Sequence, residues 1–162
     1  MKTVIIVRHA KSSWDDPAQT DFERPLNERG KRDAPEMAER LLKKKIKIDA
    51  FISSPAKRAK KTATIFAAAY GVQKDDVILK DLLYHAGEND FYAIIRQLPD
   101  AVNNIAIFSH NPGLTDFVNT LTSSVRTDNV PTCGMFAVSF EGSWETFKDA
   151  PKQFLFYDYP KS

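Results

Sequence analysis

Residues 4–10 read Val4-Ile5-Ile6-Val7-Arg8-His9-Ala10, so a short apolar run ends directly in a cation and an imidazole. A continuous apolar run of this length predicts a buried strand. In an open parallel sheet, ligands bind at the carboxyl ends of the strands. We therefore expect Arg8 and His9 to lie at the mouth of a ligand site at one edge of a sheet.

The same arrangement recurs twice along the chain. Arg58 follows the apolar segment 50–52 by a few residues, and His110 directly follows the segment 105–109. Because the carboxyl ends of parallel strands meet at one edge, three separate segments are expected to bring together Arg8, His9, Arg58 and His110. Such a cluster of guanidinium and imidazole donors suits a phosphoryl group, whose oxygens accept several charge-assisted hydrogen bonds.

Length and composition favour a single domain over residues 1–162. The chain is close to the usual size of one domain, and its 43% hydrophobic residues can build one core. Its net charge of +2 arises from 23 basic and 21 acidic residues. This balance argues against binding to nucleic acid or to a membrane surface by bulk electrostatics, so any positive field must be local.

Cysteine content indicates a reducing compartment. Cys133 is the only cysteine, so an internal disulfide is impossible, and no Cys/His cluster suggests a structural metal. A cysteine phosphatase needs an arginine at the end of the loop that follows its catalytic cysteine, and no arginine stands there after Cys133. We therefore expect the Cys133 thiol to be structural. No apolar stretch approaches a secretory signal or a membrane span. We expect a cytoplasmic protein with no metal and no cofactor.

Apolar spacing switches repeatedly between short continuous runs and a 3.6-residue period, as in alternating strands and helices. Further strands are expected at residues 48–52 and 77–79. Residues 135–140 and 153–157 alternate or are rich in aromatics, and they predict a pair of edge strands at the C-terminus. The predicted fold is α/β: a single-domain three-layer sandwich with a mostly parallel sheet flanked by helices.

Capping residues suggest where the helices begin and end. The first helix either begins at Asn27 and kinks or restarts at Asp33, and the sequence leaves this open. Ser54 and Asn111, each followed by proline, are expected to be the N-caps of the second and fourth helices. Gly71 is placed to end the second helix.

The six glycines exclude several common signatures. They are too far apart to form GxGxxG, a phosphate-binding GxxxxGK[ST] loop or a GxSxG nucleophile elbow. Dinucleotide binding, nucleotide hydrolysis and esterase chemistry are therefore disfavoured.

Four segments, in this order, resemble the histidine phosphatase superfamily, which has the phosphoglycerate-mutase-like fold, and within it the small phosphohistidine phosphatase branch. They are residues 7–10 (VRHA), 24–30 (RPLNERG), 53–59 (SSPAKRA) with Thr62-Ala63, and 109–114 (SHNPGL). One such segment alone is weak evidence. Four of them, each at an expected strand or helix boundary, are strong evidence.

The resemblance implies that His9 is the nucleophile and that a phosphohistidine intermediate forms and is hydrolysed by water. A neutral imidazole nitrogen can attack phosphorus when an acceptor such as a backbone carbonyl keeps its other nitrogen protonated. Arg8, Arg58 and His110 would bind the phosphoryl oxygens. Because these side chains supply the stabilising groups, no metal is required.

Weaker candidates lie in the loop after His9. Ser12 and Ser13 are placed for phosphate contact by loop position alone. Trp14 and the aromatic residues near the C-terminus are expected to pack rather than to recognise a ligand. Taken singly, His9 also fits a structural histidine, and Arg58 lies in a basic run typical of a solvated helix face. The joint placement of four groups outweighs these alternatives.

One part of the superfamily pattern is missing. Larger relatives place a carboxylic acid after the third strand to protonate the leaving group, whereas residues 82–86 here read Leu-Leu-Tyr-His-Ala. His85 is one candidate proton donor, and the sequence does not choose between it and the carboxylates of Asp15, Asp16, Glu88 and Asp90. An enzyme without a strong acid should prefer a leaving group that departs easily, such as the protonated imidazole of phosphohistidine.

We therefore expect a metal-independent phosphatase that acts through phospho-His9, with phosphohistidine on a protein as its substrate. Little chain is available for a lid, so an open site would admit a side chain on a protein surface. The alternatives are a phosphomonoesterase or mutase acting on a small phosphorylated metabolite, and a non-catalytic module that binds a phosphorylated ligand. A mere binder would not need an imidazole at position 9. A monomer is the favoured oligomeric state.

Overall fold

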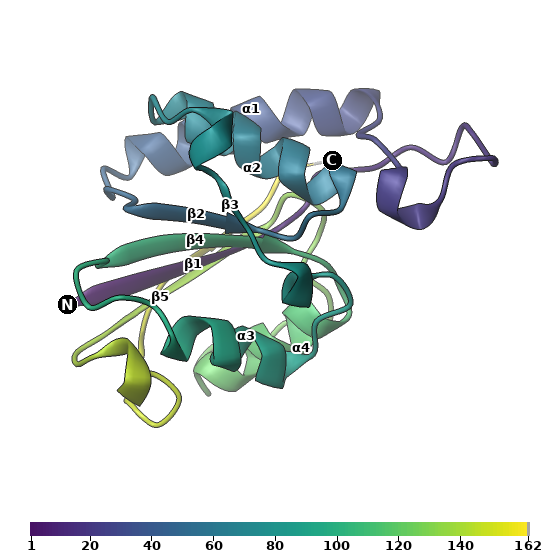
Figure 1. Ribbon diagram of the computed structural model, residues 1–162. Helices are drawn as coiled ribbons and strands as arrows, with labels where there is room; N and C mark the ends of the chain where they lie inside the picture. The colour runs from purple at the N-terminus through teal and green to yellow at the C-terminus, as the bar shows by residue number, and fades with distance from the viewer. Residues whose placement is uncertain (162) are drawn as a thin grey trace.

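The N-terminal apolar run forms a central strand of a six-stranded sheet (Figure 1). The computed structural model describes residues 1–161. The strand order is β3-β2-β4-β1-β5-β6, with β1 (Lys2–Arg8), β2 (Ala50–Ser53), β3 (Ile78–Leu79), β4 (Asn104–Ser109), β5 (Met135–Phe140) and β6 (Gln153–Asp158). The first four strands run parallel, and β5 and β6 add an antiparallel pair at one edge. The predicted α/β fold with a C-terminal edge pair is confirmed.

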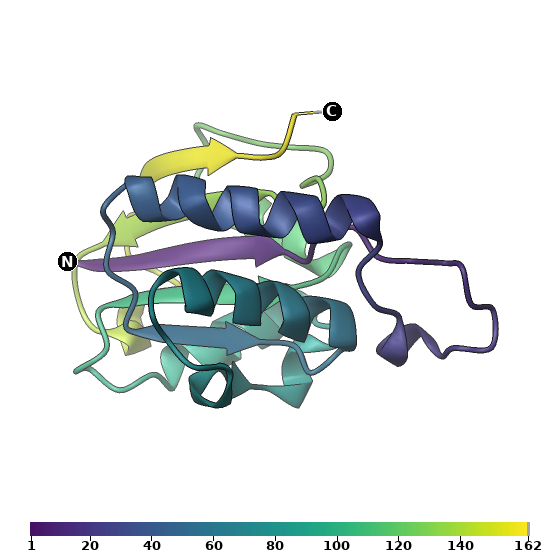
Figure 2. The ribbon, with the colours of Figure 1, turned by 90° about the horizontal axis from the view of Figure 1, so that it is seen from above.

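Helices cover both faces of the sheet. One face carries α1 (Glu28–Lys43) and α2 (Lys57–Ala69), and the other carries α3 (Glu88–Arg96) and α4 (Gly113–Leu121), as Figures 1 and 2 show. The connections contain four short 3₁₀ helices: η1 (Asp21–Glu23), η2 (Lys74–Asp76), η3 (Asp81–Leu83) and η4 (Trp144–Thr146). Within residues 1–161, no helix combines the length and the apolarity needed to cross a bilayer.

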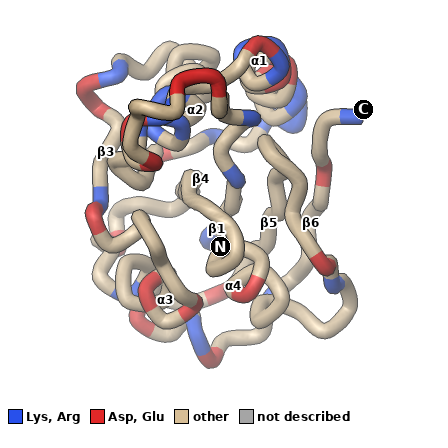
Figure 3. The backbone as a smooth tube through the Cα atoms, turned by 90° about the vertical axis from the view of Figure 1, so that its right-hand side faces the viewer, with Lys and Arg blue, Asp and Glu red and all other residues tan. Residues whose placement is uncertain are grey.

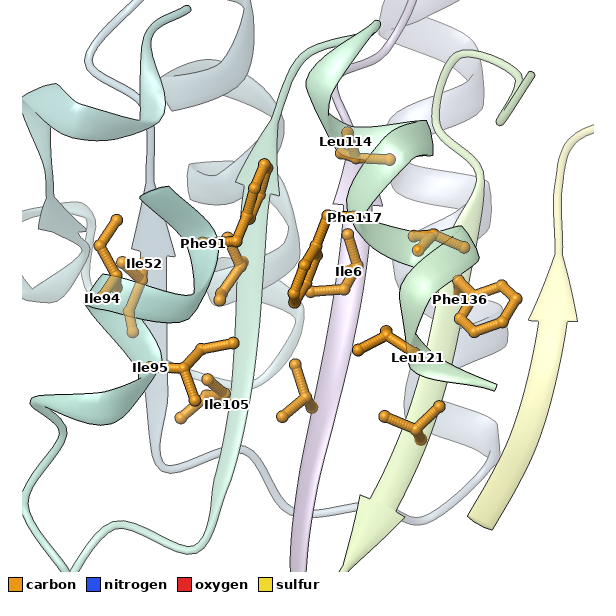
Figure 4. Packing of buried hydrophobic residues seen from close by; sticks show 14 of the residues in the cluster. Ile6, Ile52, Phe91, Ile94, Ile95, Ile105, Leu114, Phe117, Leu121 and Phe136 are labelled. Carbon is orange, nitrogen blue, oxygen red and sulfur yellow. The ribbon is translucent and has the colours of Figure 1, made fainter. Parts of the chain in front are cut away.

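The two sides of β1 face two separate cores. Ile5 and Val7 pack among residues of α1 and α2, whereas Val4 and Ile6 pack among residues of α3 and α4. Figure 4 shows the second core, where side chains of α3 and α4 meet those of the sheet. Successive strand residues point to opposite faces, so a strand covered on both sides must be apolar at every position. This explains the continuous run that the sequence begins with.

The start of α1 agrees with the first of the two positions left open by the sequence. The Asn27 side chain accepts a hydrogen bond from the Gly30 N–H at 2.8 Å, as an N-cap does. The helix then continues past Pro35, which lies inside it. Gly71 follows the end of α2 with a φ of +76°, as predicted for a helix terminator.

The predicted caps of α2 and α4 are wrong in position. The second helix starts later than expected, after an extended residue, Ala56. Ser54 Oγ accepts a hydrogen bond from the Ala56 amide at 3.2 Å and also lies 2.7 Å from His110 Nε2. Asn111 likewise lies before the cap position of α4, although its side-chain oxygen accepts a bond from Thr115 N–H at 3.1 Å. Both side chains instead contact other segments at this end of the sheet: Ser54 contacts His110, and the Asn111 amide donates to the Val130 carbonyl at 3.0 Å.

Cys133 is fully buried, as expected for a structural thiol. Burial raises the pKa of its thiol, and the carboxylates of Asp33 and Glu36 raise it further. Its backbone N–H donates to the carbonyl oxygens of Arg8 and His9, both at 3.0 Å. The residue therefore supports the backbone at the end of β1.

Gly30 holds the start of α1 against the loop that follows β1. A Cβ atom at this position would clash with the backbone carbonyl of Lys11. We expect Gly30→Ala to lower the free energy of unfolding by about 1–3 kcal/mol, as overpacking does, and urea unfolding measures this change. Gly87→Ala is the matched control, because a Cβ there meets nothing closer than 4.0 Å. Equal losses in the two variants would contradict the explanation.

Candidate active site

A pocket of about 600 Å³ opens at the carboxyl ends of β1 and β4. Arg8 ends β1, His9 and Ser12 follow it, His110 follows β4, and Arg58 lies in the first turn of α2. All five residues line the pocket. The structure thus brings together, from three segments, the residues that the sequence singled out.

The positive charge of the pocket is local. Figure 3 shows basic and acidic residues interspersed around the molecule, in keeping with its small net charge. Three guanidinium groups, of Arg8, Arg24 and Arg58, nevertheless line this one pocket. Arg58 lies in a basic run, and the sequence reading preferred a place in the pocket over a solvated helix face for it. It is 5% exposed, whereas the neighbouring Lys57 is exposed.

The ring of His9 is held in one tautomer. Its Nδ1 lies 2.8 Å from the carbonyl oxygen of Ala10. A carbonyl only accepts hydrogen bonds, so in the neutral ring Nδ1 carries the proton and Nε2 keeps its lone pair. Burial lowers the pKa of His9 well below its ordinary value, against the opposing effect of the Ala10 bond. The nearby His110 and arginines lower it further, so the ring is neutral at neutral pH.

His110 lies beside His9, with 5.1 Å between the ring centroids. Burial, and then the charge of Arg58, lower the pKa of His110 to about 3. Its Nε2 lies 2.7 Å from Ser54 Oγ. The positive charge of the pocket therefore comes from its arginines and Lys11 rather than from this imidazole.

Several donors around the pocket are incompletely paired. Arg8 Nη1 donates to the Val130 carbonyl at 2.9 Å, and Arg58 donates to the backbone carbonyl and the carboxylate of Asp21 at 2.6 and 3.0 Å. Among the described residues, the Nε atoms of Arg8 and Arg58 and Nδ1 of His110 are buried without a hydrogen-bond partner. Buried polar atoms without partners cost free energy. An oxyanion has the several acceptor atoms that guanidinium donors require.

Asp21 and Arg24 line the pocket but were not singled out from the sequence. The Asp21 carboxylate accepts hydrogen bonds from Arg24 at 3.1 Å, from Arg58 at 3.0 Å and from the Tyr84 hydroxyl at 2.7 Å. Burial alone would raise the pKa of Asp21, but these bonds outweigh it and hold the pKa well below its usual range. Arg24 begins the matching segment 24–30, which was a usable signal. No sequence pattern pointed to Asp21, because its contacts depend on how the loop folds against α2.

The two serines considered for phosphate contact differ. Ser12 is buried, and its Oγ accepts a hydrogen bond from Arg24 at 2.6 Å. Its contact with phosphate stays a prediction. Ser13 is not among the lining residues, and its Oγ accepts a bond from the Asp15 amide at 3.0 Å. The structure gives no support to Ser13.

The expectation that Trp14 packs is wrong. The residue is 72% exposed, and it lines the pocket. Its ring covers the Arg24 guanidinium, with 3.5 Å between Arg24 Cζ and the ring centroid. The aromatic residues of β6 do pack, since Phe154 and Phe156 are half-buried against the two cores.

None of the four carboxylates considered as acids, Asp15, Asp16, Glu88 and Asp90, lines the pocket. Its lining carboxylates are Asp21 and Asp116. Within residues 82–86, the segment that lacks the expected acid, Tyr84 donates its hydroxyl to Asp21 at 2.7 Å. Burial, and then Asp21, raise the pKa of Tyr84. Tyr84 is therefore a weaker acid than a free tyrosine, and Asp21 is already ionised.

His85 lies at the rim of the pocket in a left-handed backbone conformation, with a φ of +63°. This conformation is uncommon for residues other than glycine and often occurs at functional sites. Its ring packs against that of Tyr84 at a tilt of 39°, with 4.0 Å between centroids. His85 thus stays a candidate proton donor.

The lowered pKa values of His9 and His110 can be measured directly. We expect their ring NMR signals to stay unshifted as the pH falls from about 8 to about 5, whereas an ordinary histidine titrates near 6.5. His9→Asn and His110→Asn variants assign the signals. If either ring titrates near pH 6.5, the conclusion that both imidazoles are buried and neutral is wrong.

Comparison with known proteins gives one family match. The model of the histidine phosphatase superfamily (branch 1) matches residues 4–114. An uncharacterized chloroplastic protein of Arabidopsis thaliana is 28% identical over 155 residues, which covers 89% of this chain and 69% of the plant protein. Residues 4–114, which the family model matches, include Arg8, His9, Ser12, Arg58 and His110.

Solved structures share the fold. A candidate phosphohistidine phosphatase SixA from Agrobacterium tumefaciens has a TM-score of 0.83 at 22% identity, with 99% of both chains covered. The protein histidine phosphatase SixA complexed with tungstate has a TM-score of 0.81 at 21% identity, covering 97% of this chain and 96% of that one. At these identities the likeness concerns the fold.

Proposed function

Because this chain belongs to the histidine phosphatase superfamily, we propose that it hydrolyses phosphohistidine on a protein through a phosphorylated His9. Family membership identifies the chain as a phosphatase. Its substrate and the two chemical steps given below are what we propose. The observation that carries it is the 2.8 Å contact between His9 Nδ1 and the Ala10 carbonyl, which leaves Nε2 free in a pocket lined by guanidinium groups. Solved neighbours described as phosphohistidine phosphatases support the substrate class.

In the first step, His9 Nε2 attacks the phosphorus of bound phosphohistidine whose other ring nitrogen carries a proton taken up from solvent. A bond forms between Nε2 and phosphorus, and the bond from phosphorus to the substrate ring breaks. Its electron pair goes to that ring, which leaves as neutral imidazole. Arg8 and Arg58 stay charged throughout, so they stabilise the negative charge on the transferring oxygens. The Ala10 carbonyl stabilises the positive charge that develops on the His9 ring.

In the second step, water hydrolyses the phosphorylated enzyme. The water oxygen bonds to phosphorus, the bond to Nε2 breaks, and its electron pair returns to the ring. One proton of the water passes to solvent. Inorganic phosphate leaves, and His9 is neutral again for the next turnover.

Apart from His85, which stays a candidate proton donor at the rim, the titratable side chains considered in the pocket favour a nitrogen leaving group. Asp21 is ionised, the pKa of Tyr84 is raised, and His9 and His110 carry no extra proton at neutral pH. An alkoxide needs a strong acid to leave, whereas a protonated imidazole leaves as a neutral molecule. Phosphohistidine therefore suits this set of side chains better than an ordinary phosphate ester.

The experiment compares substrates and traps the intermediate. We expect kcat/KM for a phosphohistidine peptide to exceed that for sugar phosphates and glycerate phosphates, and acid-labile phosphate to appear on the protein during turnover. A strong preference for the metabolites would make the chain a phosphomonoesterase or mutase. Tight phosphate binding without turnover or trapping would make it a binding module.

We also propose that turnover is independent of metal ions. The arginine side chains supply the positive charge that a metal ion supplies in other phosphatases. We expect kcat/KM to be the same before and after treatment with EDTA. A loss of activity that Mg²⁺ or Zn²⁺ restores would overturn this prediction.

A further inference from the structure

The loop between β1 and α1 exposes large aromatic side chains beside the pocket. In both Figure 1 and Figure 2 this loop projects beyond the carboxyl ends of the parallel strands. Trp14 is 72% exposed and Phe22 is 39% exposed. Large apolar side chains grouped at a surface mark interaction sites more often than scattered single ones do. We call Trp14, Phe22 and Tyr84 the aromatic rim.

Trp14 is fixed in place although most of it faces solvent. Its ring lies over the Arg24 guanidinium at 3.5 Å, and Arg24 is itself bound to Ser12 and Asp21. The loop is closed at its base by a hydrogen bond from Ser13 N–H to the Pro25 carbonyl at 2.8 Å. An anchored aromatic side chain loses little conformational entropy when a partner covers it.

The second half of the rim is tied to the same network. The Phe22 ring meets the Tyr84 ring edge to face, with 5.1 Å between centroids. The Tyr84 hydroxyl donates to Asp21, the neighbour of Phe22 in η1. Because Trp14 and Tyr84 both line the pocket, the rim is continuous with the site that would hold the phosphoryl group.

We propose that the aromatic rim is the docking surface for a phosphorylated protein substrate, and that it contacts apolar side chains flanking the phosphohistidine. This inference rests on the proposed function. The three arginines attract the phosphoryl group, while the rim offers apolar contact area outside it. A small phosphorylated metabolite rich in hydroxyl groups would gain little from such a surface. Trp, Tyr and Arg are the residues that contribute most at protein interfaces.

The test uses three probes: free phosphohistidine, a peptide with leucine on both sides of a phosphohistidine, and the same peptide with glycine in those positions. We expect kcat/KM of the wild-type protein for the leucine peptide to exceed that for the glycine peptide by about 10-fold or more, the effect of one strong interface residue. In Trp14→Ala this preference should fall to about 2-fold or less, since an interface residue of this kind carries the difference.

Control variants separate docking from folding. Tyr159→Ala removes another exposed aromatic side chain, 44% exposed and outside the rim, and should keep the wild-type preference. Phe22→Ala should reduce the preference as Trp14→Ala does, and it replaces that variant if Trp14→Ala fails to fold.

Two results would overturn the inference. Equal turnover of both peptides by the wild-type protein, or a preference that survives in Trp14→Ala and Phe22→Ala, would show that the rim does not dock the substrate, while the proposed function stands. If the wild-type protein turns over neither peptide nor free phosphohistidine, the proposed function itself fails and the docking surface falls with it.

Discussion

His9→Ala should reduce kcat by at least about 10⁴-fold, the scale seen when a catalytic nucleophile is removed. The variant lacks Nε2 of His9, the nitrogen proposed to accept the phosphoryl group. Steady-state turnover of a phosphohistidine peptide measures the loss. Trapping with radiolabelled substrate should show acid-labile phosphate on the wild-type protein and none on the variant.

His85→Asn is the matched control for the trapping experiment. His85 also lines the pocket, but its imidazole is not held by a backbone carbonyl as His9 is. We expect the His85 variant still to form acid-labile phosphate. Acid-labile phosphate on His9→Ala would move the intermediate to another histidine. Its loss in His85→Asn with the fold intact would instead make His85 the proton donor of the first step.

Arg58→Gln should lower kcat/KM by about 10²–10³-fold, the usual cost of removing one donor that stabilises transition-state charge. The Arg58 side chain is buried and bound to Asp21 through two nitrogens, so its guanidinium is positioned before the substrate arrives. Arg58→Lys keeps the charge but loses the planar fork, and we expect it to recover only part of the activity. Inhibition by vanadate should weaken in parallel.

Lys61→Gln controls for charge on the same helix. Lys61 is exposed in α2, close in sequence to Arg58. We expect its removal to change kcat/KM by less than about 2-fold, because exposed charges are screened by salt. Similar losses in Arg58→Gln and Lys61→Gln would show that the helix contributes only a general positive field.

The predictable part of the site follows from local rules. Arg8, His9 and His110 come directly after apolar runs, and a parallel sheet places the ends of such runs at one edge. The N-cap Asn27 and the terminator Gly71 also act through their own neighbours. A sequence pattern of a few neighbouring residues is sufficient to predict such strand ends and helix caps.

Other features depend on segments far apart in the sequence. Hydrophobic periodicity alone does not separate Arg58 from the lysines around it, and the resemblance of residues 53–59 was needed to select it. Packing then buries Arg58 and leaves Lys57, Lys60 and Lys61 in solvent. Asp21 carries no motif, and its importance arises from bonds to Arg24, Arg58 and Tyr84. Ser54 was expected to cap a helix, but its hydroxyl also contacts His110.

The sequence by itself therefore determined the alternation of strands and helices, the parallel sheet and the edge at which its charged residues gather, because hydrophobic periodicity and strand ends are local properties. Only the tertiary structure decided which cations are buried, which carboxylate fixes them and that Trp14 stands exposed over Arg24. The physical reason is that burial, pKa and ion pairing depend on distances between segments. Those distances exist only once the chain has folded.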